Sequence, residues 1–433
     1  MSETQMEEGD THKDIEVAPA LIAVHPTQES VAVAVGSDLR VFDLHGGCAV
    51  SLVDDSCGPF HNDSIRAIRY GAKGKLFVSA GDDKLVKIWS TESWRCICTV
   101  SSEKRVSAVA LSNDGLYVCF ADKFGVVWVV DLNGLDRNQV STNKKEAPLL
   151  AHYCSIITGL EFSTGGRFIV SADRDFKIRV TVFPKEPLNG GHEIQSFCLG
   201  HTEFVTCLAF VSASEYPQGF LVSGSGDSTV RLWNISSGSL LDTFEVEMKL
   251  PSKGKLRSLL YRVFLHDGFF LNIIVVSLAV NMLDCSFQGV VVLSCDLSAQ
   301  TLSIAKVVSM EGECFIPTSL STGSSAGLLW MVAGVSNLRG FDNPSLTRVR
   351  VISGFEKSSL NPPEHQPTVL ADEEIPGGDQ LLEKLQGSVP VEQKVFLAAA
   401  EAVKSAMSNL LVKKQYCSET REFRKRTRND KKN

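Results

Sequence analysis

The most regular pattern of apolar and polar residues lies in segment 200–241. Segments 205–209 and 230–233 alternate with a period of two, and segment 220–223 is a short apolar run. A period of two places successive side chains on opposite faces of a β-strand, so these segments are predicted to be half-buried strands. The Gly-Asp-Ser sequence at 226–228 separates two of them and predicts a tight turn. Segment 200–241 is therefore a small antiparallel unit.

The ends of this unit carry two further signals. It opens with Gly-His at 200–201, and its third strand ends in an aromatic residue, Trp233. A Gly-His opening and a strand-end Trp in a unit of about 40 residues are typical of a WD-type propeller blade. One such blade cannot bury both of its faces alone, so more blades are expected elsewhere in the chain.

The same pattern recurs along most of the sequence and predicts an all-β fold, a seven-bladed WD-repeat β-propeller with a C-terminal helix and a basic tail. The sixth unit is the weakest, with strands expected at 272–280, 289–295 and 301–309. An aspartate lies six residues before the strand-end position in four units and sets their register: Asp83 and Trp89, Asp122 and Trp128, Asp175 and Thr181, Asp227 and Trp233. The other six units are expected at 18–53, 60–100, 104–134, 151–183, 200–241 and 314–353.

The pattern divides the chain into five parts. Residues 1–16 carry six acidic residues and are expected to be a disordered N-terminus, and 17–355 form the propeller. Residues 356–390 are rich in Pro and acidic residues and are expected to be a linker. Residues 391–414 place apolar side chains on one stripe of an amphipathic helix, and 415–433 form a basic tail.

One apolar run, 268–283, has to be weighed as a membrane span. A spanning helix needs about 20 residues, and this run is shorter, rich in β-branched residues and interrupted by Asn272 and Asn281. A pair of strands is the better interpretation, and we expect no membrane partner.

Composition narrows the function. The chain has 433 residues, 44% of them apolar, and a net charge of −7, which argues against a surface coated by nucleic acid. Its twelve cysteines include no CxxC pair, so neither a zinc site nor a disulfide framework is predicted, and a reducing compartment is expected. The acidic N-terminus lacks the apolar region of a signal peptide. No cofactor, metal or nucleotide-binding pattern is present.

A set of His, Ser, Asp and Trp residues recurs and resembles the components of a hydrolytic triad. Because the set appears more than once, a structural network that ties the strands of one blade together is the better interpretation. We therefore assign no catalytic residue and place these side chains in blade networks: His201, Ser223, Asp227 and Trp233 in one unit, and His61, Ser79, Asp83 and Trp89 in another.

Basic residues gather in three places. In the fourth unit, Arg174, Lys177 and Arg179 form either a solvated face or a docking site for an acidic partner surface. The tail fits a nuclear-localisation or nucleic-acid patch, so the nucleus is the expected location. The residues that could contact nucleic-acid phosphates, from the loop at 249–257 and from the tail, are Lys249, Lys253, Lys255, Arg257, Arg424, Lys425, Arg426 and Arg428.

The stretch RFIVSADRDFKIRV, then SFCLGHTEFV and GSGDSTVRLW, within residues 167–233, resembles one family. It is similar to the non-catalytic WD-repeat subunit of the eukaryotic tRNA (guanine-N7-)-methyltransferase. The resemblance implies a scaffold that binds no methyl donor and stabilises a separate catalytic subunit as a heterodimer. That complex forms N7-methylguanosine in the tRNA variable loop. The resemblance also implies that Lys177 and Arg179, with Arg174, face acidic residues of the partner.

Two other functions remain open at this point. The alternative is a WD-repeat substrate adaptor of a ubiquitin ligase, or another interaction scaffold. Such adaptors often carry WDxR, whereas Trp89 is followed here by Ser-Thr-Glu and Trp233 by Asn-Ile-Ser. The third is a stand-alone enzyme built on a propeller, which has no candidate site in this sequence.

Overall fold

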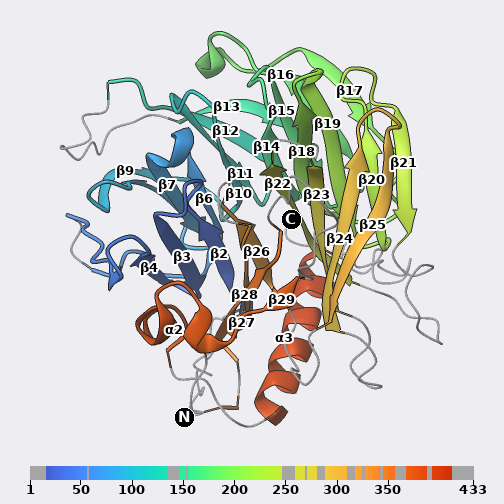
Figure 1. Ribbon diagram of the computed structural model, residues 1–433. Coiled ribbons are helices and arrows are strands. Elements are labelled where there is room, and N and C mark those ends of the chain that lie inside the picture. The colour runs from blue at the N-terminus through green and yellow to red at the C-terminus, as the bar shows by residue number, and fades with distance from the viewer. Residues whose placement is uncertain are drawn as a thin grey trace, which may run out of the picture.

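A computed structural model describes residues 16–55, 58–134, 146–152, 155–245, 259–268, 271–279, 288–309, 317–323, 327–338, 340–341, 345–355, 367–387 and 393–411. Within these ranges the strands form antiparallel sheets arranged around a ring (Figure 1). Consecutive strands along the chain pair with one another in each sheet, as the alternating pattern requires. The fold is therefore an all-β propeller, as predicted.

Seven sheets are present in the described part of the chain. The first holds β2 Leu21–Val24, β3 Ser30–Val35, β4 Asp38–Asp43 and β5 Cys48–Ala49; the second holds β6 Ile65–Gly71, β7 Leu76–Gly81, β8 Leu85–Ser90 and β9 Arg95–Ser101. The third holds β10 Val106–Leu111, β11 Tyr117–Asp122, β12 Val126–Asp131 and β13 Glu146–Ala151; the fourth holds β14 Ile157–Phe162, β15 Phe168–Asp173, β16 Ile178–Val182 and β17 Ile194–Cys198.

The remaining sheets complete the ring. The fifth holds β18 Val205–Ala213, β19 Tyr216–Ser225, β20 Thr229–Trp233 and β21 Leu240–Glu245; the sixth holds β22 Leu259–Gly268, β23 Leu271–Ala279, β24 Gln288–Asp296 and β25 Thr301–Ser309. The last holds β26 Ser319–Thr322, β27 Leu329–Ser336, β28 Leu346–Ser353, β29 Thr368–Val369 and the N-terminal β1 Ala18–Pro19. Short 3-10 helices lie at η1 Ala72–Gly74, η2 Pro187–Asn189 and η3 Asp372–Glu374.

The predicted count of seven blades stays a prediction. In the sixth sheet the side chains of β22 and β23 are not described, so the packing of these two strands against neighbouring sheets is not established. The described residues of the apolar run, 268 and 271–279, lie in this sheet, where β22 and β23 pair from Leu259 with Ala279 to Gly268 with Leu271. No helix in the described ranges is long and apolar enough to cross a membrane.

The ring is closed by residues from both ends of the chain. β1 pairs with β27, with Ala18 opposite Ser336. Next to it, the Thr318 hydroxyl donates to the carbonyl oxygen of Ala20 at 2.7 Å, and the N–H of Val24 donates to Ser321 Oγ at 2.9 Å. Figure 1 shows the blue first sheet beside the orange last sheet, and these contacts join the two.

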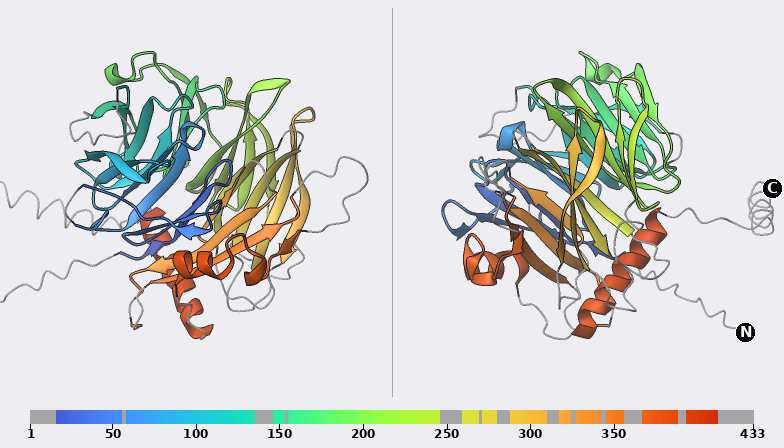
Figure 2. Two further views of the ribbon diagram at one scale, coloured as in Figure 1. Left: turned by 60° about the vertical axis from the view of Figure 1, so that its left-hand side comes forward. Right: turned by 45° about the vertical axis from the view of Figure 1, so that its right-hand side comes forward.

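A helix packs across this closure from outside. α2 Gly378–Gln386 buries Leu381, Leu382 and Leu385 against a core formed by the first and last sheets, including Phe42. The Gln386 amide oxygen accepts from the N–H of Val349, and Arg40 donates to the carbonyl oxygen of Leu385. In Figure 2 this helix lies beside the strands of those sheets.

The expectation of a plain linker over 356–390 is therefore wrong for residues 367–387. Proline and acidic residues flank three leucines at helical spacing, and the helix that carries these leucines packs against β4, β5 and β28. Composition alone hid a short amphipathic helix inside a polar stretch.

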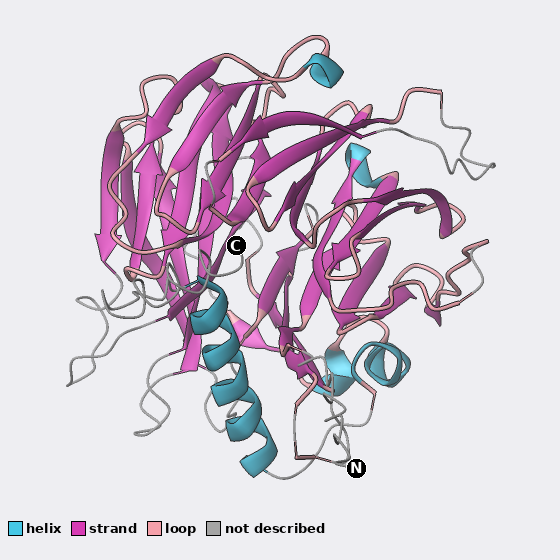
Figure 3. Ribbon diagram, turned by 180° about the vertical axis from the view of Figure 1, so that it is seen from behind, coloured by secondary structure: helices cyan, strands magenta, loops and turns pink. Residues whose placement is uncertain are grey.

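A second helix, α3 Gln393–Leu411, lies within the range expected for the C-terminal helix, 391–414. Its residues Val395, Phe396, Ala399, Ala400 and Val403 are buried against the region where β27 turns into β28, at Val335, Leu338 and Leu346. Figure 3 shows α3 lying against the strands rather than within a sheet. The residues of the predicted basic tail, 415–433, lie outside the described residues.

Shortening Leu381 should destabilise the whole ring. The side chain of Leu381 is fully buried between two sheets, so Leu381→Ala is expected to lower the free energy of unfolding by about 2–5 kcal/mol. The matched control is Leu397→Ala in α3, where the leucine is 39% exposed and the loss should stay below about 1 kcal/mol. Equilibrium urea unfolding measures both, and equal losses would contradict a closing role for α2.

Candidate partner-binding surface

Two of the sheets contain the complete His, Ser, Asp and Trp network. In the second sheet, His61 Nδ1 lies 2.7 Å from Asp83 Oδ2 and His61 Nε2 lies 2.8 Å from Ser79 Oγ. Trp89 Nε1–H donates to the same Ser79 Oγ at 3.0 Å. Since the carboxylate only accepts, the imidazole donates through Nδ1 and accepts the serine proton at Nε2. The serine proton thus points to the imidazole in a fixed chain of bonds inside one sheet.

The fifth sheet repeats this geometry with His201, Ser223, Asp227 and Trp233. The distances are 2.9 Å from His201 Nδ1 to Asp227 Oδ2, 2.7 Å from His201 Nε2 to Ser223 Oγ, and 2.8 Å from Trp233 Nε1 to Ser223 Oγ. Both serines are fully buried. Each network joins strands within its sheet and presents no open face to a substrate, which agrees with its interpretation as a structural device.

Burial and hydrogen bonding set the charge states of the fifth-sheet network. Burial lowers the pKa of His201 below its ordinary value of 6.5, against the opposing effect of Asp227, so the ring is held neutral. Burial by itself would raise the pKa of Asp227. Hydrogen bonds from His201, Thr229 and the N–H of Thr202 outweigh it, so the pKa of this carboxyl lies well below its usual range.

The third and fourth sheets depart from the pattern. In the third, Trp128 Nε1–H donates directly to Asp122 Oδ2 at 3.0 Å. In the fourth, His152 contacts Ser171 Oγ at 2.7 Å and Asp173 Oδ2 at 2.9 Å. The aspartate of this network is therefore Asp173, not Asp175, which the predicted register paired with Thr181. Asp173 ends strand β15 two residues after Ser171, and this places its carboxylate beside the imidazole.

The turns between the second and third strands of the sheets lie on one face of the propeller, which we name the second-turn face. It carries residues 82–84, 123–125, 174–177 and 226–228. The candidate partner-binding residues Arg174 and Lys177 belong to the turn of the fourth sheet, and Arg179 is the second residue of strand β16. The structure therefore brings all three basic residues together at one edge of one sheet.

These three side chains differ in exposure. Lys177 is exposed, whereas Arg174 and Arg179 are half-buried. Arg179 Nη1 donates to the carbonyl oxygen of Ala151 at 3.2 Å, while its buried Nε makes no hydrogen bond to the described residues. Burial lowers the pKa of the Arg179 guanidinium. Arg179 is thus held by one hydrogen bond from Nη1, and its guanidinium has further N–H groups that can donate.

Apolar side chains surround this basic edge. Phe197, 43% exposed, stands directly opposite Arg179 in the pairing of β16 with β17. Ile194 and Leu199, at either end of the same outer strand, are 43% and 60% exposed. Phe176, in the turn itself, is 41% exposed. Aromatic and aliphatic side chains beside an arginine are the composition of a protein interface core. Ile194, Phe197 and Leu199 lie between the predicted units 151–183 and 200–241, so the sequence analysis assigned no role to them.

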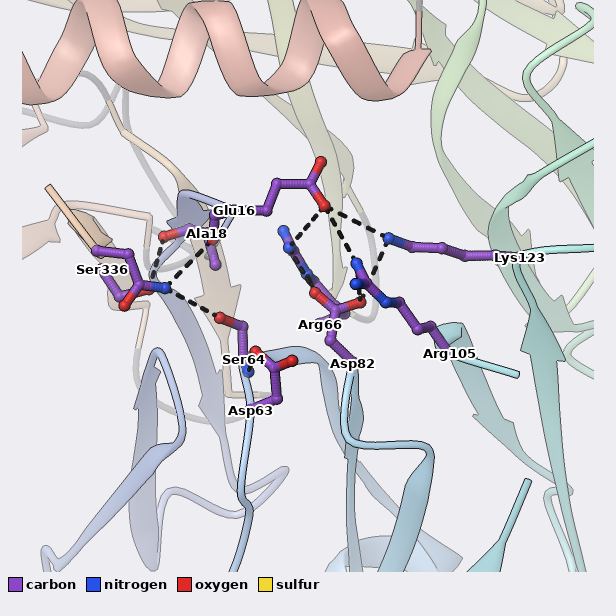
Figure 4. Close-up of polar contacts among 10 residues, drawn as sticks. Glu16, Ala18, Asp63, Ser64, Arg66, Asp82, Arg105, Lys123 and Ser336 are labelled. Atoms are coloured by element: carbon purple, nitrogen blue, oxygen red, sulfur yellow. Dashed lines mark hydrogen bonds and ion pairs between the residues drawn. The ribbon is translucent and has the colours of Figure 1, made fainter. Parts of the chain in front are cut away.

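A second charged cluster lies on the second-turn face at the second and third sheets (Figure 4). Asp82, 2% exposed, accepts a 2.6 Å bond from Arg66 and lies 3.3 Å from Lys123 Nζ. Glu16 Oε2 lies 3.4 Å from Arg105 Nη1 and 3.6 Å from both Arg66 Nη2 and Lys123 Nζ. These residues lie far apart in the sequence and form no local motif, so sequence reasoning missed the cluster.

The two carboxylates are bound unequally. Asp82 is buried and close to its partners, whereas Glu16 is 35% exposed and sits at longer distances. Exposed ion pairs of this kind contribute about 0–1 kcal/mol because water and salt screen them. Asp82 is therefore a fixed part of the cluster, and Glu16 is an exchangeable one.

The structure does not describe the candidate tRNA-contacting residues. They lie outside the described ranges: Lys249, Lys253, Lys255, Arg257, Arg424, Lys425, Arg426 and Arg428. Within those ranges, no group of three or more His, Cys, Asp or Glu side chains is arranged to hold a metal ion.

Comparison with known protein families identifies the class of repeat and then a particular domain. Residues 57–90 match the WD domain, G-beta repeat, which confirms a propeller of the WD40 type. Residues 136–303 match the tRNA methyltransferase TRM82 WD40 domain. The resemblance predicted from 167–233 is confirmed, since that stretch lies wholly within the matched region.

Curated relatives carry the corresponding name. A 188-residue region is 36% identical to the tRNA (guanine-N(7)-)-methyltransferase non-catalytic subunit wdr4 of Danio rerio, covering 43% of this chain and 41% of the relative. The human subunit WDR4 is 33% identical over 181 residues, covering 41% and 39%. The Dictyostelium discoideum subunit is 28% identical over 263 residues, covering 58% and 54%. The chain thus matches about half or less of these relatives' length.

Solved structures agree on the fold. The structure of U3-55K superimposes with a TM-score of 0.57 at 17% identity, covering 73% of this chain and 88% of that one. The β-propeller domain of Cps50 (Swd1) from Myceliophteria thermophila gives 0.54 at 12% identity, covering 72% and 93%. At these identities the likeness concerns architecture alone.

Removing Ser223 should destabilise the fifth sheet. Ser223→Ala leaves the buried Trp233 N–H and His201 Nε2 without their partner, so a loss of about 2–3 kcal/mol in unfolding free energy is expected. Urea unfolding with Ser214→Ala, an exposed serine, as the control measures this loss. If both variants were equally stable, the network would contribute nothing.

The same network predicts acid sensitivity. Because the pKa of folded His201 lies below 6.5, the unfolded chain binds this proton more readily, and stability falls as the pH drops through about 6.5. The lowered pKa of Asp227 acts in the same direction at lower pH. We expect the urea midpoint to fall between pH 7.5 and 5.5, with a shallower fall in His201→Gln. Parallel pH curves for the two proteins would refute this assignment.

Proposed function

We propose that this chain is the non-catalytic subunit of a tRNA (guanine-N7-)-methyltransferase. The observation that carries the proposal is the match of residues 136–303 to the TRM82 WD40 domain, a region that includes the candidate residues Arg174, Lys177 and Arg179. Curated relatives that match 43% and 41% of this chain are named as that non-catalytic subunit. The chain is then a scaffold, proposed as seven blades, that binds and stabilises a catalytic partner as a heterodimer.

The role proposed for the chain is binding rather than chemistry. The exposed ammonium of Lys177 meets a carboxylate of the partner, and the half-anchored Arg179 offers its remaining N–H groups to another. Phe197 and Leu199 supply the apolar area that such an interface buries. Because Arg179 is already fixed through Ala151, little side-chain entropy is lost on docking.

The proposed complex forms N7-methylguanosine in the tRNA variable loop, and tRNA is bound through the complex. The loop residues Lys249, Lys253, Lys255 and Arg257 and the tail residues Arg424, Lys425, Arg426 and Arg428 are proposed to add non-specific attraction for the phosphate backbone. The basic tail also supports a nuclear location as part of this proposal.

A methylation assay tests the function directly. The purified chain alone, the candidate catalytic subunit alone and the co-expressed pair are each incubated with tRNA and a radiolabelled methyl donor, and N7-methylguanosine is quantified. The pair should be strongly active and the chain alone inactive. Failure of the pair to co-purify or to exceed the catalytic subunit alone would refute the proposal.

Charge reversal at the basic edge should break the complex. Combining Lys177→Glu with Arg179→Glu replaces two attractions by repulsions toward acidic partner groups, and affinity for the catalytic subunit should fall about hundredfold or more. Calorimetry or pull-down with the catalytic subunit measures this loss. Lys177→Glu alone is the cleaner variant, because Arg179 also holds Ala151.

The matched control is Lys185→Glu, an exposed lysine in the loop between β16 and β17, on the opposite side of the same sheet. It makes the same charge change without touching the second-turn face. Unfolding midpoints of all variants show whether the sheet is intact. Equal affinity of Lys177→Glu and Lys185→Glu for the catalytic subunit would place the interface elsewhere.

A further inference from the structure

Three cations surround the carboxylate of Glu16 on the second-turn face. Three positive side chains, Arg66, Arg105 and Lys123, converge on one carboxylate oxygen of the half-buried Glu16 at 3.4–3.6 Å. Figure 4 shows them reaching this oxygen from two different sheets, with Asp82 beneath. Arginine and lysine groups arranged in this way bind carboxylate and phosphate oxygens alike.

The site is built on rigid elements. Arg66 lies at the start of β6 and Asp82 follows β7, while Arg105 precedes β10 and Lys123 follows β11. Asp82 fixes the Arg66 guanidinium through a 2.6 Å bond and stays buried. Lys123 Nζ also lies 3.3 Å from Asp82, so two of the three cations have a buried carboxylate partner besides Glu16. Glu16 is tied by its own carbonyl oxygen, which accepts from Asn337 Nδ2 at 3.2 Å, so its side chain is able to leave the site while the backbone stays in place.

An aromatic side chain stands beside these cations. Phe124, the residue after Lys123, is 62% exposed, and the ammonium of Lys104 lies 5.2 Å from the centre of its ring. The Asp122 carboxylate accepts from the N–H groups of Phe124 and Val126, which fixes the turn. Gly125, at φ +89°, permits the close approach of Ser155 and His152 carbonyl oxygens behind it. The exposed ring is thus carried by a turn whose backbone is held in place.

We propose that Arg66, Arg105 and Lys123 bind a backbone phosphate of tRNA, with an adjacent unpaired base stacked on Phe124, and that Glu16 occupies this phosphate site in cis when RNA is absent. Cations interleaved with an exposed aromatic ring favour nucleic acid over a phosphorylated peptide, because stacking uses the face of a base. The inference rests on the proposed function and adds a tRNA-binding surface to it on the second-turn face, which also carries Arg174 and Lys177.

The sequence before Glu16 is consistent with a competing role. Five further acidic residues precede it: Glu3, Glu7, Glu8, Asp10 and Asp14. RNA has to displace Glu16 to reach the phosphate site, and the acidic residues before Glu16 repel it. RNA that makes few other contacts therefore binds poorly. Such a competitor raises selectivity for RNA able to engage several sites together, and lowers affinity for short or unrelated strands.

The test measures tRNA binding by the full chain in complex with its catalytic subunit, with fluorescence anisotropy as the readout across a salt series. Arg105→Ala and Lys123→Ala should each weaken binding about three- to tenfold and lower the salt slope by about one. Phe124→Ala should weaken binding about tenfold with an unchanged slope. Glu16→Gln should tighten binding about three- to tenfold.

Matched controls lie on the opposite face. Lys75→Ala removes an exposed cation from the loop between β6 and β7, and Glu193→Gln neutralises an exposed carboxylate in the loop before β17. Both should leave tRNA affinity within about twofold of the unaltered complex. Unfolding midpoints of every variant identify any loss of folded protein, and Arg105 and Phe124, both well exposed, are the substitutions least able to disturb the fold.

The outcomes separate the inference from the proposed function. If Arg105→Ala, Lys123→Ala and Phe124→Ala behave like Lys75→Ala while the complex still assembles and methylates tRNA, this surface does not bind RNA and the inference is overturned. If Glu16→Gln behaves like Glu193→Gln, the competing role is overturned. A complex that neither assembles nor methylates overturns the proposed function instead. In that case anisotropy on the chain alone decides whether the surface binds RNA.

Discussion

Closure of the ring is the constraint on which the rest of the structure depends. Each sheet of a propeller buries its two faces against neighbours, so the first and last sheets are stable only when they meet. Among the contacts through which they meet, β1 pairs with β27, Thr318 donates to the carbonyl oxygen of Ala20, and α2 packs across the outside. The N-terminus and a segment more than 350 residues later therefore stabilise the same core.

A closed ring gives the second-turn face its rigidity. The residues proposed to bind a partner or RNA lie in short turns or at strand ends, and the turns are fixed by carboxylates from within. Asp122 holds the turn that carries Phe124, and Asp173 accepts from the N–H of Lys177 at 3.0 Å in the next sheet. Buried His, Ser and Asp networks thus have two structural effects: they join strands, and they set the positions of exposed side chains. Such a surface is suited to recognition that requires little rearrangement on binding.

Much of this structure follows from the sequence because its signals are local. Alternation of apolar and polar residues over about six positions is enough to predict a strand. The spacing of His201, Ser223, Asp227 and Trp233 predicts a network inside one unit. The fourth unit shows the limit of this reasoning, since Asp173 and Asp175 both fit a local pattern and only the backbone decides that Asp173 contacts His152.

Features that depend on distant residues were not predictable in this way. Glu16, Asp82 and Lys123 belong to different units, and nothing in their neighbourhoods indicates that they meet. α2 was not predicted because its three leucines stand among prolines and acidic residues. Only the fold shows that they pack against the first and last sheets. Local sequence patterns predict individual strands and helices. Which charged groups pair and which apolar faces pack together depends on the three-dimensional arrangement of distant residues.

Dependence on both ends of the chain also sets an order of events during synthesis. Ala18 leaves the ribosome early, yet its bond to Ser336 spans 318 residues. At about 5–20 residues per second the partner strand is made roughly 15–60 s later. Through that interval the nascent first sheet presents the apolar face that β27 and α2 will cover, and transiently exposed apolar surface of this kind favours aggregation. A message truncated before the codons for α2 would yield a nearly full-length protein that lacks part of its closure, and such a product is a candidate for degradation rather than a partly active subunit.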